Sequence, residues 1–439
     1  MKLSTILTQQ EVPEVFITGV SIDTRTIEKG QLFIAIKGEN FDGHNFIQAA
    51  ELAGAVAVIC ERKIIGVSIS QILVKDSLQT LALMASAYRE QIQLKVIALT
   101  GSNGKTSVKE MISHILPEPY FATKGNLNNH IGVPLCVLKL KPTDKYAVFE
   151  LGASHIGEIA YTANIVKPDV ALINNIAPAH IEGFGSIDGV ARAKGEIYES
   201  LSSAGVAVVN DDDYYANFWN SIISDKKTIR FSRKMAADIY AENIVFSDTG
   251  FVKFNLICDG NAHIVKLRVP GVHNVSNALA AAACTYAAGI ELEKIISGLE
   301  SFTGVAGRVT FKTGKKKSVI IDDTYNANLR SSLTALDVLS ARAGYRVLVF
   351  GDMGELGLYT KDHHQKVGLA AREAGIDLVL TCGKHSEDTS KAFGRDGMHF
   401  SDKKSLVSEL LPKLNENTTV LVKGSRSAAM EEIVNELGC

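Results

Sequence analysis

A glycine-rich loop follows a short apolar run near residue 100. Residues 95–99 (Lys-Val-Ile-Ala-Leu) have the character of a buried strand, and residues 100–107 (Thr-Gly-Ser-Asn-Gly-Lys-Thr-Ser) precede a helical pattern. A strand, a glycine loop and a helix N-terminus together direct backbone N–H groups and the positive end of the helix dipole towards a phosphate. The arrangement therefore predicts a nucleotide site in which Lys105 reaches the β- and γ-phosphates and the Thr106 hydroxyl coordinates Mg²⁺.

The loop is a shortened form of the general phosphate-loop pattern. GxxxxGKS/T expects glycine where this chain has Leu99, so the pattern here is TGxxGKT. A tight strand–helix turn with a chance Lys-Thr pair is the alternative, and the flanking strand and helix favour nucleotide binding. The predicted phosphate-binding residues are Gly101, Ser102, Asn103, Gly104, Lys105, Thr106 and Ser107.

Length and charge limit the class of protein. A chain of 439 residues with 46% hydrophobic and 21% charged residues is too long for one core and predicts two or three globular domains. The 46 Lys and Arg nearly balance the 48 Asp and Glu, so charge does not indicate a nucleic-acid or membrane surface. We expect no nucleic-acid partner and a monomer.

Cysteine usage and hydropathy indicate the compartment. The six cysteines are scattered without a CxxC pair, which argues against a zinc ribbon or a disulfide scaffold and suits a reducing environment. The N-terminus soon turns polar and lacks a signal-peptide core. No apolar run reaches the roughly 20 residues that a membrane helix needs. These features predict a cytoplasmic protein without membrane insertion.

Strand-like runs alternate with helical patterns, which indicates an α/β fold. We divide the chain into residues 1–90, 91–310 and 311–439. The expected strands are residues 32–36, 55–59, 95–99, 146–150, 170–173, 318–321, 346–350, 378–381 and 419–422, and the clearest helices are 78–90 and 274–288.

Two polar residues follow later strands of the central block. Glu150 ends the run 146–150, and His180 follows the run 170–173 after a short loop. Parallel α/β sheets place their sites at the carboxyl ends of strands. A carboxylate and an imidazole there suit a second divalent cation, although Mg²⁺ more often takes oxygen ligands. Glu150 as a helix cap and His180 as a hydrogen-bonded loop residue remain open alternatives.

A lysine lies on the apolar face of a predicted helix. Helical spacing places on one face Ile187, Val190, Ala191, Ile197, Tyr198 and Leu201. Lys194 is seven residues after Ile187 and shares this face. Such a lysine either extends its ammonium to solvent or has a chemical role, and the residues alone favour the first.

An ordered set of segments resembles the Mur ligase family, and within it the members that add D-alanyl-D-alanine. The set comprises residues 23–25 (DTR), 42–44 (DGH), 125–134 (GNLNNHIGVP), 150–154 (ELGAS), 179–186 (AHIEGFGS), 193–197 (AKGEI), 270–278 (PGVHNVSNA), 307–308 (GR), 322–328 (DDTYNAN), 351–357 (GDMGELG) and 423–426 (KGSR). They cover essentially the whole chain in order, which makes the resemblance far more specific than one short motif.

The resemblance implies three domains: a small N-terminal α/β UDP-binding domain, a central P-loop ATPase domain with a mostly parallel sheet, and a C-terminal Rossmann-like ligase domain. It assigns Thr106 to one Mg²⁺, and Glu150 and His180 to a second. It also implies that CO₂ carbamylates Lys194, giving an anion that helps to hold the second metal and explains an inward lysine.

The resemblance also assigns ligand contacts. It implies Asn274 and Asn277 near the adenine of ATP, Arg308 near the γ-phosphate, and Asp322 or Asp323 with Asn326 near the ribose and the far side of ATP. The residues expected to bind the UDP-linked substrate are Thr24, Arg25, Asp42, His44, Asn126, Asn128, Asn129 and Ser154.

The implied reaction joins D-alanyl-D-alanine to UDP-N-acetylmuramoyl-tripeptide through an acyl phosphate, with Lys105, Lys194, His180 and Arg308 as catalytic residues. Thr24 stands where many relatives have serine, and Leu329 replaces the proline usual after YNAN. The alternatives are a sibling Mur ligase or a folylpolyglutamate-type ligase, a P-loop kinase of small molecules, and a nucleotide-binding regulatory module.

Overall fold

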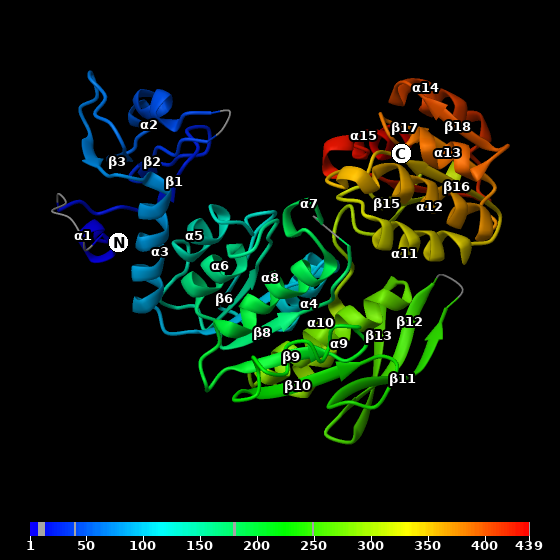
Figure 1. The fold of residues 1–439 in the computed structure, drawn as a ribbon, viewed down its shortest axis with the longest axis horizontal. Helices are drawn as coiled ribbons and strands as arrows, with labels where there is room; N and C mark the ends of the chain where they lie inside the picture. The colour runs from blue at the N-terminus through cyan, green and yellow to red at the C-terminus, as the bar shows by residue number, and fades with distance from the viewer. Residues whose placement is uncertain (8–13, 39–40, 179–180, 248–249, 439) are drawn as a thin grey trace.

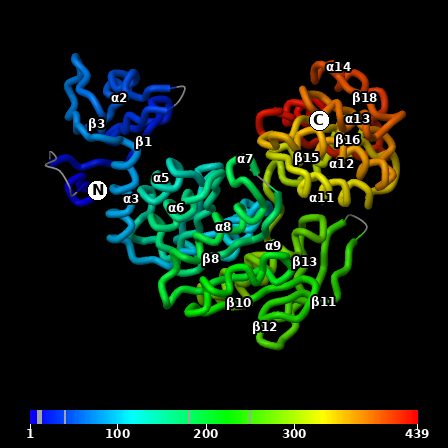
Figure 2. The backbone as a smooth tube through the Cα atoms, in the orientation of Figure 1, coloured from blue at the N-terminus to red at the C-terminus, as the bar shows by residue number. Residues whose placement is uncertain are grey.

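A computed structural model of the chain describes residues 1–7, 14–38, 41–178, 181–247 and 250–438. It forms three α/β domains, each built around its own sheet. The small N-terminal domain and the C-terminal domain lie at opposite ends of the central one (Figure 1). The tube in Figure 2 shows that the two chain ends lie in the two outer domains. No helix among the described residues combines the length and apolarity needed to cross a bilayer.

The N-terminal domain has a four-stranded parallel sheet in the order β1-β2-β3-β4. Its elements are α1 (Leu3–Ile6), β1 (Val20–Ser21), β2 (Leu32–Ile34), η1 (Gly43–Phe46), α2 (Ile47–Leu52), β3 (Ala57–Cys60), β4 (Ser70–Leu73) and α3 (Ser77–Gln91). All residues of β2 and β3 are buried, as expected for a parallel sheet covered on both faces.

Helix α3 joins the first domain to the second. Its apolar face belongs to one continuous core that also contains α1 and the helices α5 and α6 of the central domain. The Tyr88 hydroxyl donates to the Leu140 carbonyl (2.7 Å), and Arg89 Nε donates to the Val166 carbonyl (2.8 Å). The predicted division at residue 90 therefore falls inside a helix that packs on both domains, and it stays a prediction as a boundary.

The central domain has a nine-stranded sheet in the order β13-β12-β11-β10-β9-β8-β5-β7-β6. Its elements are β5 (Lys95–Thr100), α4 (Lys105–Ile115), β6 (Tyr120–Ala122), α5 (Gly132–Val137), β7 (Tyr146–Glu150), α6 (Glu158–Val166), β8 (Val170–Ile173), α7 (Ile181–Phe184), α8 (Ile187–Glu199), β9 (Val206–Asn210), β10 (Lys227–Ser232), β11 (Ile239–Phe246), β12 (Phe251–Cys258), β13 (Asn261–Pro270), α9 (Val272–Ala287) and α10 (Leu292–Ser301). All neighbouring strands from β6 at one edge through β7, β5, β8, β9 and β10 to β11 pair in parallel. Strands β12 and β13 extend the sheet as an antiparallel hairpin.

The C-terminal domain has a six-stranded sheet in the order β14-β15-β19-β16-β17-β18, parallel except for the edge strand β14. Its elements are β14 (Thr310–Thr313), η2 (Lys315–Lys317), β15 (Val319–Asp323), α11 (Leu329–Ser340), β16 (Tyr345–Phe350), η3 (Gly357–Tyr359), α12 (Thr360–Glu373), β17 (Leu378–Cys382), α13 (Glu387–Phe393), β18 (Gly397–Phe400), α14 (Lys403–Leu410), η4 (Leu411–Lys413), β19 (Thr418–Lys423), η5 (Arg426–Ala428) and α15 (Glu431–Leu437). Helix α11 lies on the side of the domain that faces the central domain (Figure 1).

The predicted α/β class and each strand and helix named from the sequence are confirmed, with ends that differ by one or two residues. The central hairpin β12–β13 was not among the predicted strands. In the described part of the chain all cysteines are free and buried.

Candidate active site

The glycine loop has the predicted strand–loop–helix geometry. Strand β5 ends at Thr100 and α4 begins at Lys105, directly after Gly104. Gly104 has φ +77°, and a Cβ there would lie 2.5 Å from Asn277 Oδ1 and 2.6 Å from Asn174 Nδ2. A side chain at this position would thus meet both strain and collision. The loop therefore packs closely against the side-chain amides of Asn174 and Asn277 and leads directly into the N-terminus of α4.

Four asparagines hold the glycine loop. The Asn103 N–H donates to Asn175 Oδ1 (2.9 Å), and Asn174 Nδ2 donates to the Asn103 carbonyl (2.9 Å) and to Asn277 Oδ1 (3.3 Å). Asn277 Nδ2 in turn donates to Asn274 Oδ1 (3.1 Å). Asn274 and Asn277, predicted near the adenine, therefore lie beside the loop. Asn174 and Asn175 were not among the predicted site residues. Their position directly after strand β8 places them at the carboxyl end of a parallel strand, where α/β sites form.

Glu150 carries a carboxylate oxygen without a partner. It ends β7 and is 3% exposed. Its Oε1 accepts from Asn128 Nδ2 (2.9 Å), and its Oε2 is buried with no hydrogen-bond partner. The helix-cap alternative is therefore not what this structure has. A buried unpaired carboxylate oxygen is costly, and a divalent cation is the partner that oxygen donors of this kind favour.

Two other predicted metal ligands are Thr106 and His180. Thr106 lies in the first turn of α4. His180 lies outside the described residues, so its prediction is not placed by the structure. Within the described residues, no group of three or more His, Cys, Asp and Glu gathers to hold a metal. The metal contacts of Thr106, Glu150 and Lys194 remain predictions.

Lys194 lies on the inward face of its helix, as the spacing predicted. It lies on α8, is 3% exposed, and its Nζ is 5.9 Å from the centroid of the Phe184 ring. Burial lowers the pKa of Lys194 well below its ordinary value, and the charge of Lys105 lowers it further. Burial therefore favours the uncharged amine, and the expectation from the residues alone that the ammonium extends to solvent is wrong. Ile187, predicted on the same inward face, is instead 37% exposed because it begins the helix.

Basic groups outnumber acidic ones around the loop. Lys105 Nζ donates to the Gly101 carbonyl (2.7 Å). Burial lowers the pKa of Lys105, the Glu150 charge opposes that shift and the Arg308 charge adds to it. The Arg308 guanidinium carbon lies 4.1 Å from the centroid of the Tyr325 ring, and its Nε is buried without a partner. Lys105 thus interacts with one carboxylate, Glu150, and with two further basic residues, Arg308 and Lys194, and this excess of positive charge favours a polyanionic ligand.

The acidic pair that ends β15 is held by lysines. Asp322 pairs with Lys312 (2.7 Å), and Asp323 pairs with Lys423, which also donates to the Asn326 carbonyl (2.9 Å). Burial raises the pKa of Asp323 and lowers that of Lys423, and their ion pair opposes both shifts. The predicted ATP contacts of Asp322, Asp323 and Asn326 remain predictions.

Two side chains at the start of α11 connect the C-terminal domain to the central one. Asn328 caps α11 through its Oδ1, and its Nδ2 donates to Asn103 Oδ1 (2.8 Å). Arg330 Nη1 donates to the Ile176 carbonyl (3.0 Å). Leu329 occupies the first helical position where the family pattern has proline, and α11 still begins there. Neither interdomain contact was predicted from the sequence.

Two of the predicted substrate residues have internal partners. The His44 ring is 2% exposed; its Nδ1 pairs with Asp42 Oδ1 (2.6 Å) and its Nε2 accepts from the Glu61 N–H (2.8 Å). Arg62 binds the other Asp42 oxygen (2.8 Å). Asp42 and His44 therefore help to hold their loop. Both nitrogens of the His44 ring already have partners, so neither remains for a ligand. Arg25 is exposed and held by Asp23.

The predicted segment from Asn126 to Asn129 borders Glu150. Asn128 contacts that carboxylate, whereas Asn129 Oδ1 accepts from the Gly132 N–H (2.8 Å) at the start of α5. Asn126 is exposed, and the Ser154 N–H donates to Glu158 (2.7 Å). Their substrate contacts, like that of half-buried Thr24, stay predictions.

Comparison with known families covers most of the chain. Residues 16–89 match the family described as Mur ligase family, catalytic domain; residues 99–285 match Mur ligase middle domain; and residues 307–426 match Mur ligase, glutamate ligase domain. The chain belongs to the Mur ligase family. The resemblance drawn from the ordered segments is thereby confirmed.

Known ligases and solved structures match this Mur ligase over nearly its whole length. It is 45% identical over 429 residues to the UDP-N-acetylmuramoyl-tripeptide–D-alanyl-D-alanine ligase of Escherichia coli K12, with 97% of this chain and 94% of that protein covered. The ligase of the same name from Bacillus subtilis is 34% identical, with 98% and 95% covered. A crystal structure of MurF from Acinetobacter baumannii superposes with a TM-score of 0.92 at 37% identity, covering 99% of this chain and 97% of that one.

A nucleotide complex is among the similar structures. The MurF ligase from Thermotoga maritima in complex with ADP has a TM-score of 0.84 at 28% identity, with 95% and 96% covered. A folylpolyglutamate synthase from Mycobacterium tuberculosis, at 16% identity and a TM-score of 0.63, shares the fold alone.

Proposed function

We propose that this Mur ligase joins D-alanyl-D-alanine to UDP-N-acetylmuramoyl-tripeptide at the expense of ATP, forming the pentapeptide precursor of peptidoglycan with ADP and phosphate as products. The observation that carries the proposal is that Lys105, bound to the glycine loop, interacts with Glu150, Arg308 and Lys194. The full-length similarity to ligases of this name supports the choice of substrates. We place the reaction in the cytoplasm and expect a monomeric enzyme.

The first step transfers the γ-phosphoryl group of ATP to the terminal carboxylate of the tripeptide. The bond between the γ-phosphorus and the bridging oxygen breaks, a new oxygen–phosphorus bond forms, and ADP leaves. Both reactants are anions, so alignment and charge neutralisation matter more than covalent help from the protein. Lys105 and Arg308 supply positive charge, and the loop N–H groups orient the phosphates.

The second step forms the amide. The free amine of D-alanyl-D-alanine attacks the acyl carbon, a tetrahedral intermediate forms, and inorganic phosphate leaves as the amine loses its proton. Exclusion of water matters here because water also cleaves acyl phosphates. The contacts from Asn328 and Arg330 to the central domain are suited to bring the C-terminal domain over the nucleotide.

The proposal includes two Mg²⁺ ions. We assign one to Thr106 and a second to Glu150, His180 and a carbamylated Lys194; bound there, they would neutralise the triphosphate. The unpaired Glu150 Oε2 supports the second assignment. Burial lowers the pKa of Lys194 and so favours the uncharged amine, which supports carbamylation: the nitrogen lone pair forms a bond to the CO₂ carbon and a proton is released.

The test supplies purified enzyme with ATP, Mg²⁺ and UDP-N-acetylmuramoyl-tripeptide, with or without D-alanyl-D-alanine. We expect phosphate release that depends on the dipeptide, and a mass spectrum showing the pentapeptide product. Equal turnover with L-glutamate would indicate a sibling ligase, and phosphate release without any amine would indicate a kinase or an ATPase. Either result would overturn the proposal.

A further inference from the structure

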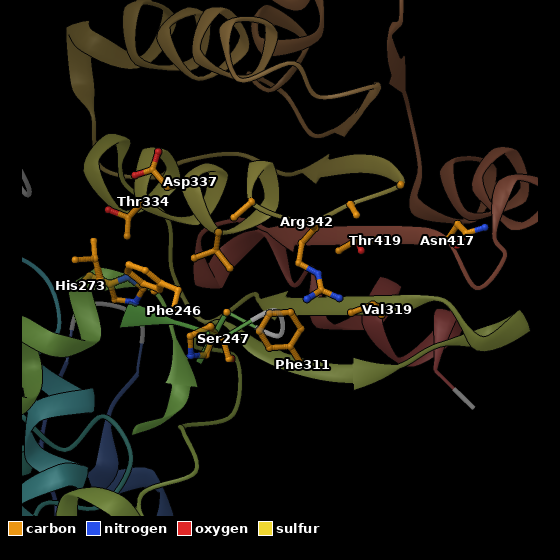
Figure 3. Close-up of a pocket in the computed structure, with 18 of the residues that line it drawn as sticks. Phe246, Ser247, His273, Phe311, Val319, Thr334, Asp337, Arg342, Asn417 and Thr419 are labelled. Atoms are coloured by element: carbon orange, nitrogen blue, oxygen red, sulfur yellow. The ribbon is translucent and has the colours of Figure 1, made fainter. Parts of the chain in front are cut away.

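A cavity of about 720 Å³ lies between the central and C-terminal domains. We call it the rear cavity (Figure 3). Its central-domain wall is Phe246 and the turn from Pro270 to His273; its other wall is formed by β14, the second half of α11 and the first residues of β15 and β19. Because Asp323 and Lys423 end the same two strands, the rear cavity lies at the opposite end of that sheet from the glycine loop. Its size is in the range of small-molecule sites.

One cation in the rear cavity has no counterion among the described residues. Arg342 follows the end of α11, and its side chain points into the cavity towards Phe311 (Figure 3). Its guanidinium carbon lies 5.5 Å from the centroid of that ring. Its Nε is buried without a hydrogen-bond partner, and among the described residues it forms no ion pair. A partly buried guanidinium in this state is unfavourable until an anion pairs with it.

The other ionisable groups that face the cavity limit the charge of the ligand. His273 has a buried Nδ1 without a partner, and burial together with Lys423 lowers its pKa to about 4, so the ring is neutral. Asp337 and Glu416 are exposed at the rim. Among the described lining residues, one cation inside and two carboxylates at the mouth favour a monoanion over a dianion such as a phosphate monoester.

The remaining walls are apolar and suit a flat ring. Phe311 and Phe246 provide aromatic surface, and the side chains of Val272, Val319 and Val338 complete the lining. The planar fork of an arginine matches the two oxygens of a carboxylate. We propose that the rear cavity binds a planar aromatic monocarboxylate, with its carboxylate on Arg342 and its ring against Phe311.

The probe is 2-naphthoate, titrated calorimetrically into the full-length protein with saturating ADP present. Arg342→Gln should weaken binding by about tenfold or more, as expected for loss of a charge-assisted pair. Asp337→Asn should tighten it, because a repelling charge is removed. Arg372→Gln, an exposed change on α12, should leave binding unchanged. Circular dichroism and thermal melting establish that each variant is folded.

Three comparisons can overturn this proposal independently of the ligase activity. Uncharged 2-naphthylmethanol should bind at least tenfold more weakly than 2-naphthoate, and equal binding would contradict the role of Arg342. Tighter binding of 2-naphthyl phosphate would contradict the preference for a monoanion. Binding of 2-naphthoate in a parallel titration without ADP, but not with saturating ADP, would show that the probe occupies the nucleotide site instead.

Discussion

Replacing Asn328 with serine separates two roles of one side chain. Asn328 Oδ1 accepts from the Ser331 N–H (2.9 Å) and caps α11, whereas Nδ2 donates to Asn103 Oδ1 (2.8 Å). Serine retains the cap, but its side chain ends one atom nearer the backbone and does not reach Asn103. One neutral hydrogen bond contributes about 0.5–1.5 kcal/mol. If the contact stabilises the closed, reactive arrangement, kcat/KM for ATP should fall about two- to twelvefold.

The assay measures ADP formation at subsaturating ATP, beside thermal unfolding of the same proteins. Asn328→Ala is the matched variant, because it loses both the interdomain bond and the cap. Its free energy of unfolding should be about 0.5–2 kcal/mol lower than that of Asn328→Ser. Wild-type kcat/KM in Asn328→Ser would refute the reasoning, because the contact would then contribute nothing to turnover. Equal destabilisation of both variants would refute the separation of the two roles.

Three further outcomes are expected at the glycine loop. Lys105→Ala should abolish phosphate release, because the glycine loop loses the positive charge that Lys105 holds beside the Gly101 carbonyl; measurable single-turnover product would contradict this. Lys194→Ala should lose most activity and recover part of it with added formate or acetate, which can stand in for a carbamate; full activity without additive would contradict carbamylation. Burial holds the pKa of Lys194 in the folded protein well below 10.5, its ordinary value. Between the folded and the unfolded pKa, the unfolded chain binds a proton that the folded chain lacks, so the stability of the unmodified protein rises with pH there. In CO₂-free urea unfolding, Lys194→Met should therefore be more stable than the parent at pH 7, by a margin that shrinks towards pH 10; a constant margin would count against a buried neutral amine.

Much of the fold and of the phosphate loop could be predicted because the signals are local. The run before Gly101 is apolar because a parallel strand is buried on both faces, and Gly104 is required where φ is positive and two amides approach. Lys194 could likewise be placed on an inward helix face from spacing alone. His44 shows the limit of a motif, which does not reveal that both ring nitrogens are already bonded within the domain.

The sequence by itself determined the order of strands and helices, the glycine loop and the family to which the chain belongs, since each depends on residues near one another in the chain. Only the tertiary structure decided which distant groups meet: Asn328 with Asn103, and Lys105 with Glu150, Arg308 and Lys194. It also decided that Arg342 faces an apolar cavity with no counterion among the described residues. The physical reason is that backbone geometry and periodicity are local properties. Burial and charge, which decide protonation and binding, depend on how separate elements pack.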